Sequence, residues 1–202
     1  RVTLGVNSLI LPALGVTAYA GYGNSLNFGT DSSNVKLDSP MTSDPRYNSF
    51  IGGAEVRVRL LSKMQLSLGW ARDFFDSIFA TYAADDRLYL HYDHFVWRGL
   101  ALHLRLDTYF RDYGELVQAS ALNYTGYVYS DTASKNRKDI LLNYNAEVSY
   151  RVLSWLELGV NYSLLYDKTD FAFCRTAGCS GSDRVAAQFI RHAILGRIDI
   201  AY

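Results

Sequence analysis

The sequence predicts an all-β fold, an antiparallel transmembrane β-barrel of about eight to ten strands, for three reasons. In residues 100–111, leucines occupy even positions and charged residues odd ones. Successive side chains of a strand point to opposite faces, so this strand would have one apolar face and one charged face. The predicted connections alternate short and long, as in bacterial outer-membrane barrels. In strand after strand, one face carries charged residues. A dry core could hold so many charges only if each had a partner.

The composition agrees with this fold. The 202 residues suffice for one all-β domain, 1–202, and the net charge of +0 gives no reason to expect nucleic acid as a partner. No apolar run approaches the ~18–20 residues of a membrane helix, whereas a barrel hides its apolar residues in alternation. The chain begins at Arg1, so we expect either a mature form or a fragment.

The first half of the chain alternates in several segments. In segment 1–12, Val2, Leu4 and Val6 alternate with polar or small residues, and Pro12 ends the pattern because proline donates no ladder hydrogen bond. Residues 24–49 and 75–85 lack periodicity, and we expect both to be long outside loops. The further strands are expected at residues 13–23, 50–60, 64–74 and 87–96.

The second half continues the pattern with strands at 100–113, 139–152, 156–167 and from residue 186 to the C-terminus. The long loops are expected at 114–138, whose tyrosines could extend a strand beyond the membrane, and at 168–185. Trp97 and Trp155 lie at short turns, with Tyr150 and Tyr202 near the same end. This placement is typical of an interfacial aromatic belt.

The candidate functional residues are the charged side chains of odd parity, which would line the lumen. Such charges can select what passes through a pore. They can also pair with one another and only keep the interior polar, and the sequence favours this second interpretation for any single residue. Tyr19, Tyr89 and Tyr109 share the parity, and their rings could stack on sugars or pack the interior. The lumen-lining candidates are Arg57, Arg59, Arg87, His91, His103, Arg105, Asp107, Glu147, Glu157, Arg191 and Arg197.

The sequence gives little reason to expect an enzyme, a metal or a cofactor. His91, His94, His103 and His192 could serve acid–base chemistry, but His–carboxylate pairs arise readily on any charged face. Cys174 and Cys179 have no nearby histidine, so they form a poor metal site. We expect them to form a local disulfide in an exposed loop, which would fit an extracytoplasmic protein.

Two longer segments carry a resemblance to a known family. They are LSLGWARDFFDSIFATYAADDRLYLHYDHFVWRGLALHLRLDTYFRDY and DILLNYNAEVSYRVLSWLELGVNYSLLYDKTDF. From about residue 50 to its end the chain resembles the outer-membrane barrels of exopolysaccharide and capsule export, the β-barrel porin type 2 group. The closing HAILGRIDIAY, ending at Tyr202, resembles the signal read by the barrel-assembly machinery, although the spacing at Gly196 departs from its common form.

The resemblance implies a passive, porin-like polysaccharide conduit in the outer membrane of a Gram-negative bacterium. Its partners would be outer-membrane lipid, polysaccharide and periplasmic export components. Members of the group usually build larger barrels than this chain can, so we expect the C-terminal part of a larger barrel, with 1–12 the remnant of a preceding hairpin. If 1–12 is not a wall strand, the chain is a small eight-stranded barrel with a structural, adhesive or loop-binding role. An outer-membrane lipid-modifying enzyme is a third alternative.

Overall fold

The structure is a computed structural model that describes residues 1–24, 47–75, 77, 82–114, 128–129, 137–169, 171–174 and 184–200. Strands make up its regular structure: β1 (Val2–Leu11), β2 (Leu14–Asn24), β3 (Asn48–Leu61), β4 (Met64–Phe75), β5 (Ala83–Trp97), β6 (Leu100–Tyr113), β7 (Val128–Tyr129), β8 (Lys138–Leu153), β9 (Leu156–Thr169), β10 (Ala172–Cys174), β11 (Arg184–Ala186) and β12 (Phe189–Ile200). Within the described ranges, no helix is long and apolar enough to cross a membrane.

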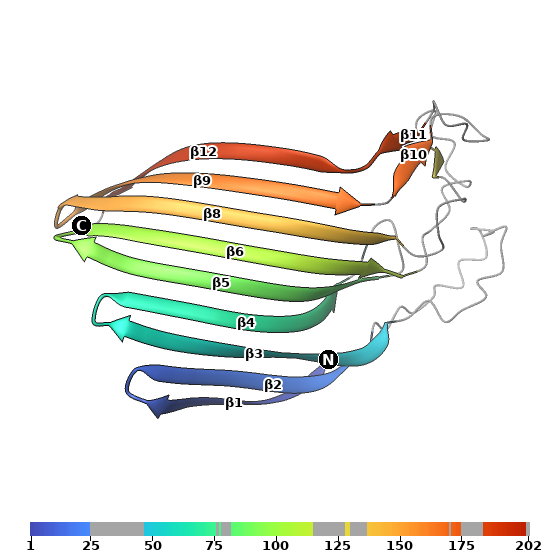
Figure 1. The fold of residues 1–202 in the computed structure, drawn as a ribbon, viewed down its shortest axis with the longest axis horizontal. Helices are drawn as coiled ribbons and strands as arrows, with labels where there is room; N and C mark the ends of the chain where they lie inside the picture. Colours follow the sequence, from blue (N-terminus) through green and yellow to red (C-terminus); the bar gives the residue numbers. More distant parts are fainter. Residues whose placement is uncertain are drawn as a thin grey trace.

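Nine long strands form one antiparallel sheet in the order β1-β2-β3-β4-β5-β6-β8-β9-β12 (Figure 1). The predicted antiparallel all-β fold is therefore confirmed. Segment 1–12 supplies a full strand, because β1 pairs with β2 from Val2 opposite Tyr22 to Leu11 opposite Leu14. The two edge strands, β1 and β12, are not paired with each other, so the sheet is open and the expected closure is not seen.

Three segments expected as loops contain strand residues. β5 begins at Ala83, inside the range 75–85, because Ala83 and Ala84 already pair with Tyr113 and Asp112 of β6. The short strands β7, β10 and β11 form a separate three-stranded sheet from residues expected in the loops 114–138 and 168–185. Pairing between distant segments stabilises such short strands, and no periodicity within two or three residues can reveal it.

Four tight turns join the long strands at one end of the sheet, the turn end (left in Figure 1). Each leaves two residues between paired strand ends, as at Trp97 opposite Leu100. In that turn Arg98 and Gly99 have positive φ angles of 28° and 97°, the region that a two-residue type I′ hairpin requires. Neighbouring hairpins are tied together here, since Arg151 N donates to Gly99 O at 2.9 Å.

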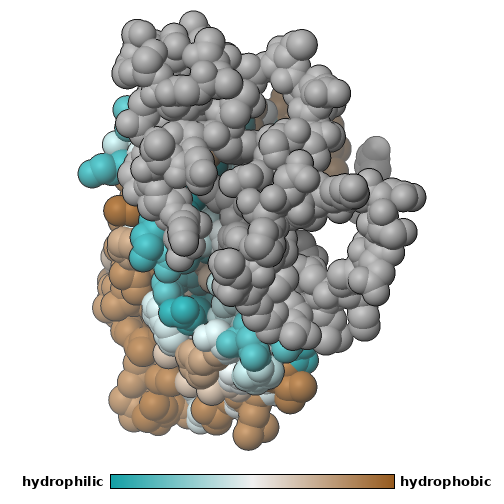
Figure 2. All heavy atoms as spheres, turned by 90° about the vertical axis from the view of Figure 1, so that its right-hand side faces the viewer, coloured by the Kyte–Doolittle hydropathy of each residue, from teal (hydrophilic) through white to brown (hydrophobic). Residues whose placement is uncertain are grey.

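The sheet curves so that its odd-numbered side chains lie on the concave side. Nη1 of Arg1 lies 3.1 Å from Oδ2 of Asp73 on β4, whereas a flat sheet would separate β1 from β4 by about 14 Å. Viewed from the loop end, opposite the turns, brown apolar residues form the left and lower outside, and teal polar residues lie inward of them (Figure 2). The curvature therefore gathers the charges and turns the apolar side chains outward.

The described residues bury few apolar side chains. One small core cluster, formed by Tyr47, Ile51, Phe74 and Ala84, lies at the loop end of β3, β4 and β5. Tyr47 stacks on Phe74 with ring centroids 4.2 Å apart. Large side chains of the outer face are exposed instead, such as Leu68 at 60% and Ile198 at 69%. The protein is thus mainly polar on its concave face and apolar on its convex face.

Candidate functional site

The polar concave face is the candidate site, and strand register places all the predicted lumen-lining residues on it. One row of paired residues runs Arg57, Ser67, His91, Arg105 and Asn145 across β3 to β8. The next row toward the turns runs Arg59, Gln65, Asp93, His103 and Glu147. The other candidates have the same odd parity on their strands: Arg87 on β5, Asp107 on β6, Glu157 on β9, and Arg191 and Arg197 on β12.

A buried carboxylate joins β5 to β6 at the centre of this face. Asp107 Oδ1 accepts a hydrogen bond of 2.7 Å from Nε of Arg87 and lies 3.4 Å from Nε2 of His91. The Asp107 side chain is only 10% exposed, whereas that of Arg87 is 35% exposed. Burial of a carboxylate requires compensating partners, and these two residues provide them. The three candidates therefore form one structural cluster.

Tyr89 links three strands beside that cluster. Its hydroxyl donates a 2.8 Å hydrogen bond to Oε2 of Glu55 on β3, so its ring crosses β4. Gly69 of β4 lies directly beneath the ring, where a Cβ would collide with it. Glu55 also accepts a 2.6 Å hydrogen bond from Arg57. In this structure Tyr89 packs against neighbouring strands of the concave face, as the second interpretation of its role expected.

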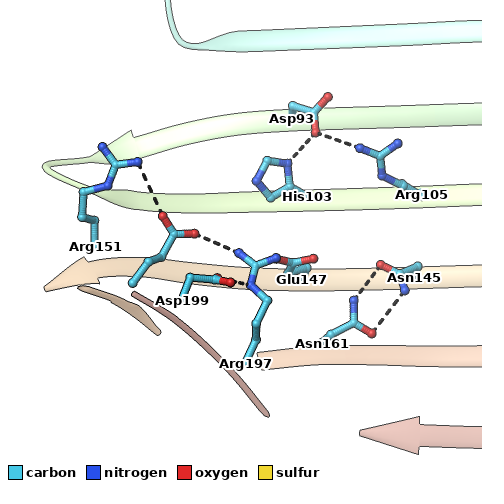
Figure 3. A network of polar contacts seen from close by, with 10 residues as sticks. Asp93, His103, Arg105, Asn145, Glu147, Arg151, Asn161, Arg197 and Asp199 are labelled. Atoms are coloured by element: carbon cyan, nitrogen blue, oxygen red, sulfur yellow. Dashed lines mark hydrogen bonds and ion pairs between the residues drawn. The ribbon is translucent and has the colours of Figure 1, made fainter. Parts of the chain in front are cut away.

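Arg197 forms a second cluster, on β8, β9 and β12 (Figure 3). Its guanidinium lies 2.6 Å from Glu147, 2.9 Å from Glu157 and 2.6 Å from Asp199. Nearby, Asn145 and Asn161 exchange two side-chain hydrogen bonds of 3.2 and 3.0 Å. Arg197 brings together three carboxylates that would otherwise repel one another, and Arg151 lies 3.6 Å from one of them, Glu157. Each acid therefore has a cationic partner, although the cluster keeps a net negative charge.

Ion pairs continue at the loop end. Arg111 donates to both oxygens of Asp85, at 2.7 and 2.8 Å. Arg137, just outside β8, lies 2.6 Å from Asp139, whose side chain is 1% exposed. Burial disfavours the charge of Arg137, but the hydrogen bond and attraction of Asp139 outweigh it and raise the pKa of the guanidinium.

The turn end of β3–β6 differs, because positive charge there exceeds negative charge. A pocket of about 550 Å³ opens between the turn ends of β3, β4, β5 and β6. Its one carboxylate, Asp93, lies 2.6 Å from Nδ1 of His103 and 3.8 Å from Nη2 of Arg105. Within the described ranges, the side chains of Arg59 and Lys63 have no acidic partner. Among the pocket's lining residues are Arg59, Lys63, Gln65, Asp93, Phe95 and Arg105.

The sequence prediction missed most of the acidic residues that complete these clusters. Glu55, Asp85, Asp93 and Asp199 all have odd parity, so the rule that selected the arginines could have selected them. Arg111 also has odd parity and was likewise left out of the prediction. Parity alone could not show the partners, because each pair depends on register and curvature.

The histidines divide between the two faces. His91 and His103 lie beside carboxylates on the concave face, whereas His94 and His192 lie on the convex face near Tyr92 and Tyr162. Ser67 is opposite His91 in register, but in the described part of the chain no hydrogen bond joins its hydroxyl to that ring. The described residues also contain no group of three His, Cys, Asp or Glu that could hold a metal ion.

Several predictions fall outside the described parts of the chain. Cys179 and Tyr202 are not among the described residues, and only the backbone of Cys174 is described, so the expected disulfide stays a prediction. The loop expected at 24–49 lies largely outside them as well. Trp97 and Trp155 are described, and both are exposed at the turn end, at 62% and 49%.

Comparisons with known proteins identified no relative of this chain. No protein-family model matches the chain, and neither the curated proteins nor the solved structures contain a match.

Proposed function

We propose that the chain forms part of the wall of an outer-membrane β-barrel that acts as a passive, porin-like conduit for an exported polysaccharide. The observation that carries the proposal is the continuous apolar convex face behind a charged concave face. Val160 at 57% and Ile194 at 74% exposure are typical of that convex face. Soluble monomers rarely expose apolar patches beyond a few hundred Å², so this face needs an apolar environment such as lipid.

The position of charge on the convex face supports a membrane-spanning band. Arg72, Asp86 and Lys168 share one register row near the loop end. Between that row and the turns, the described even positions carry no Asp, Glu, Lys or Arg. A tilted strand needs about 9–11 residues to cross a bilayer, and residues 100–110 of β6 supply that length. Loops at the charged end would then face outward, and the tight turns would face the periplasm.

The directions of the edge strands favour a barrel larger than this sheet. β1 and β12 both run from the loop end to the turn end, so they cannot pair antiparallel with each other. Antiparallel closure needs an odd number of further strands between them, and nine plus an odd number gives the even count of bacterial barrels. Because β1 is a wall strand, the eight-stranded alternative loses support. A larger barrel leaves an aqueous channel.

A second candidate function, a filled barrel with a structural role, is favoured by the ion pairs. Asp107 is paired with Arg87, and every carboxylate of the Arg197 cluster has a cationic partner, as expected of side chains that pack an interior. The two candidates differ in whether ions pass. We expect the purified protein, reconstituted in a planar lipid bilayer, to give stable conductance steps. Correctly folded protein that inserts but carries no current would exclude the conduit and leave the filled barrel.

The export assignment needs a separate test in the producing organism. We expect deletion of the gene to reduce polysaccharide at the cell surface, with restoration by the complementing gene. Normal surface polysaccharide in the deletion strain would exclude the export role, even if the protein conducts ions.

A further inference from the structure

We infer that the pocket at the turn end binds the carboxylate of an acidic sugar, which names the substrate class of the proposed conduit and rests on that function. The pocket brings Arg59 of β3, Lys63 of the β3–β4 turn and Arg105 of β6 around one space. Among the described residues that line it, Asp93 is the only acid, and it is already engaged by His103 at 2.6 Å (Figure 3). The pocket therefore keeps a positive charge that its own side chains do not neutralise.

The pocket differs from the ion-paired clusters of the concave face. The guanidiniums of Arg87, Arg111 and Arg197 each have a carboxylate within 3 Å. Arg105 has only a 3.8 Å approach to Asp93, and Arg59 and Lys63 have no carboxylate partner among the described residues. A guanidinium presents a planar fork of donors that matches a carboxylate, so these free donors suit an anionic ligand.

The other lining residues suit a sugar ring. Phe95 is 58% exposed and offers an apolar surface on which the C–H face of a pyranose can pack. Gln65 and Ser62 offer hydrogen-bonding groups for hydroxyls. The volume of about 550 Å³ lies within the range of small-molecule sites, about 300–1,000 Å³. Phe95 N also donates to Lys63 O at 2.9 Å, which holds the turn against β5.

The position of the pocket gives the site a role in transport. It opens on the concave face next to the tight turns, the end that would face the periplasm. A second pocket of about 310 Å³, lined by Asn7, Thr17 and Arg57, shares Arg59 and Gln65 with the first. Together they form a continuous basic surface along β1–β6, where successive acidic sugars of one chain could bind as they enter.

Isothermal titration calorimetry on the protein folded in detergent tests this inference. We expect tetragalacturonate to bind and the neutral maltotetraose not to bind. Arg59→Gln and Arg105→Gln should each weaken tetragalacturonate binding about tenfold, since each removes a charged hydrogen-bond donor. Arg98→Gln is the matched control, because Arg98 is also a cation at the turn end but lies in the β5–β6 turn and does not line the pocket.

Three results would overturn the inference: equal binding of maltotetraose, equal binding of inorganic sulfate, or full affinity in both pocket variants. Equal sulfate binding would show an anion site without preference for a sugar. The binding assay needs no current, so its failure in a protein that conducts ions would refute this inference alone. Binding by a protein that carries no current would instead refute the conduit.

Discussion

Glycines at odd positions make room for tyrosine rings on the concave face. Gly53 lies beneath the ring of Tyr19, and Gly69 beneath that of Tyr89. The missing side chains let each ring lie flat across a neighbouring strand, which brings the Tyr89 hydroxyl to Glu55. The position of each tyrosine ring therefore depends on the missing Cβ atom of a glycine as well as on hydrogen bonds.

Gly69→Ala should destabilise the protein by about 1–3 kcal/mol, the usual cost of overpacking, because the new methyl group would overlap the Tyr89 ring. Gly196→Ala is the control, since a Cβ there has no atom within 4 Å and should leave stability nearly unchanged. Urea unfolding of the protein folded in lipid vesicles measures both. Equal stability of the two variants would contradict the position assigned to the ring.

At the scale of the element, β6 shows how one strand serves two environments. Leu102, Leu104 and Leu106 lie on its convex face, and His103, Arg105 and Asp107 on its concave face. The sequence predicted this strand with the same bounds, because period-two alternation over fourteen residues is a strong local signal. The strand shows where each side chain points but not what its charged residues contact.

Leu104→Arg should reduce folding stability in lipid by about 2–4 kcal/mol, the cost of an arginine near the bilayer midplane on a lipid-facing strand. Arg105→Leu should cost less, since the guanidinium of Arg105 makes only a 3.8 Å approach to Asp93. Folding titrations in vesicles over a range of urea concentrations compare the two. The opposite ranking would mean that the lipid-facing and lumen-facing sides are exchanged.

At the scale of the whole molecule, the convex apolar face and the open edges determine behaviour in solution. The described residues contain only one small apolar cluster, so stability must come from strand pairing, the concave ion pairs and the medium around the convex face. Curvature brings β1 and β4 together through Arg1 and Asp73, but the edges of β1 and β12 stay unpaired. Unpaired edges and apolar faces both promote association in water.

The protein should therefore remain in solution only with detergent, and an unheated sample should migrate differently from a heated one in a denaturing gel. The reason is that a folded membrane sheet resists the detergent until heat unfolds it. Gel electrophoresis of paired samples, with chromatography in the presence and absence of detergent, checks this. A detergent-free monomer with a single migration would contradict the lipid-facing assignment.

The sequence by itself determined the all-β class, the parity of the two faces and the tight turns, because these follow from alternation and turn residues within short segments. It placed the start of β5 too late, since Ala83–Asp86 become a strand by pairing with β6. Tertiary structure alone decided which charges meet. Arg197 reaches carboxylates of β8 and β9 that lie 50 and 40 residues away in the chain, respectively, through register and curvature. The same two factors leave Arg59 and Lys63 in a pocket with no acidic partner in the described part of the chain.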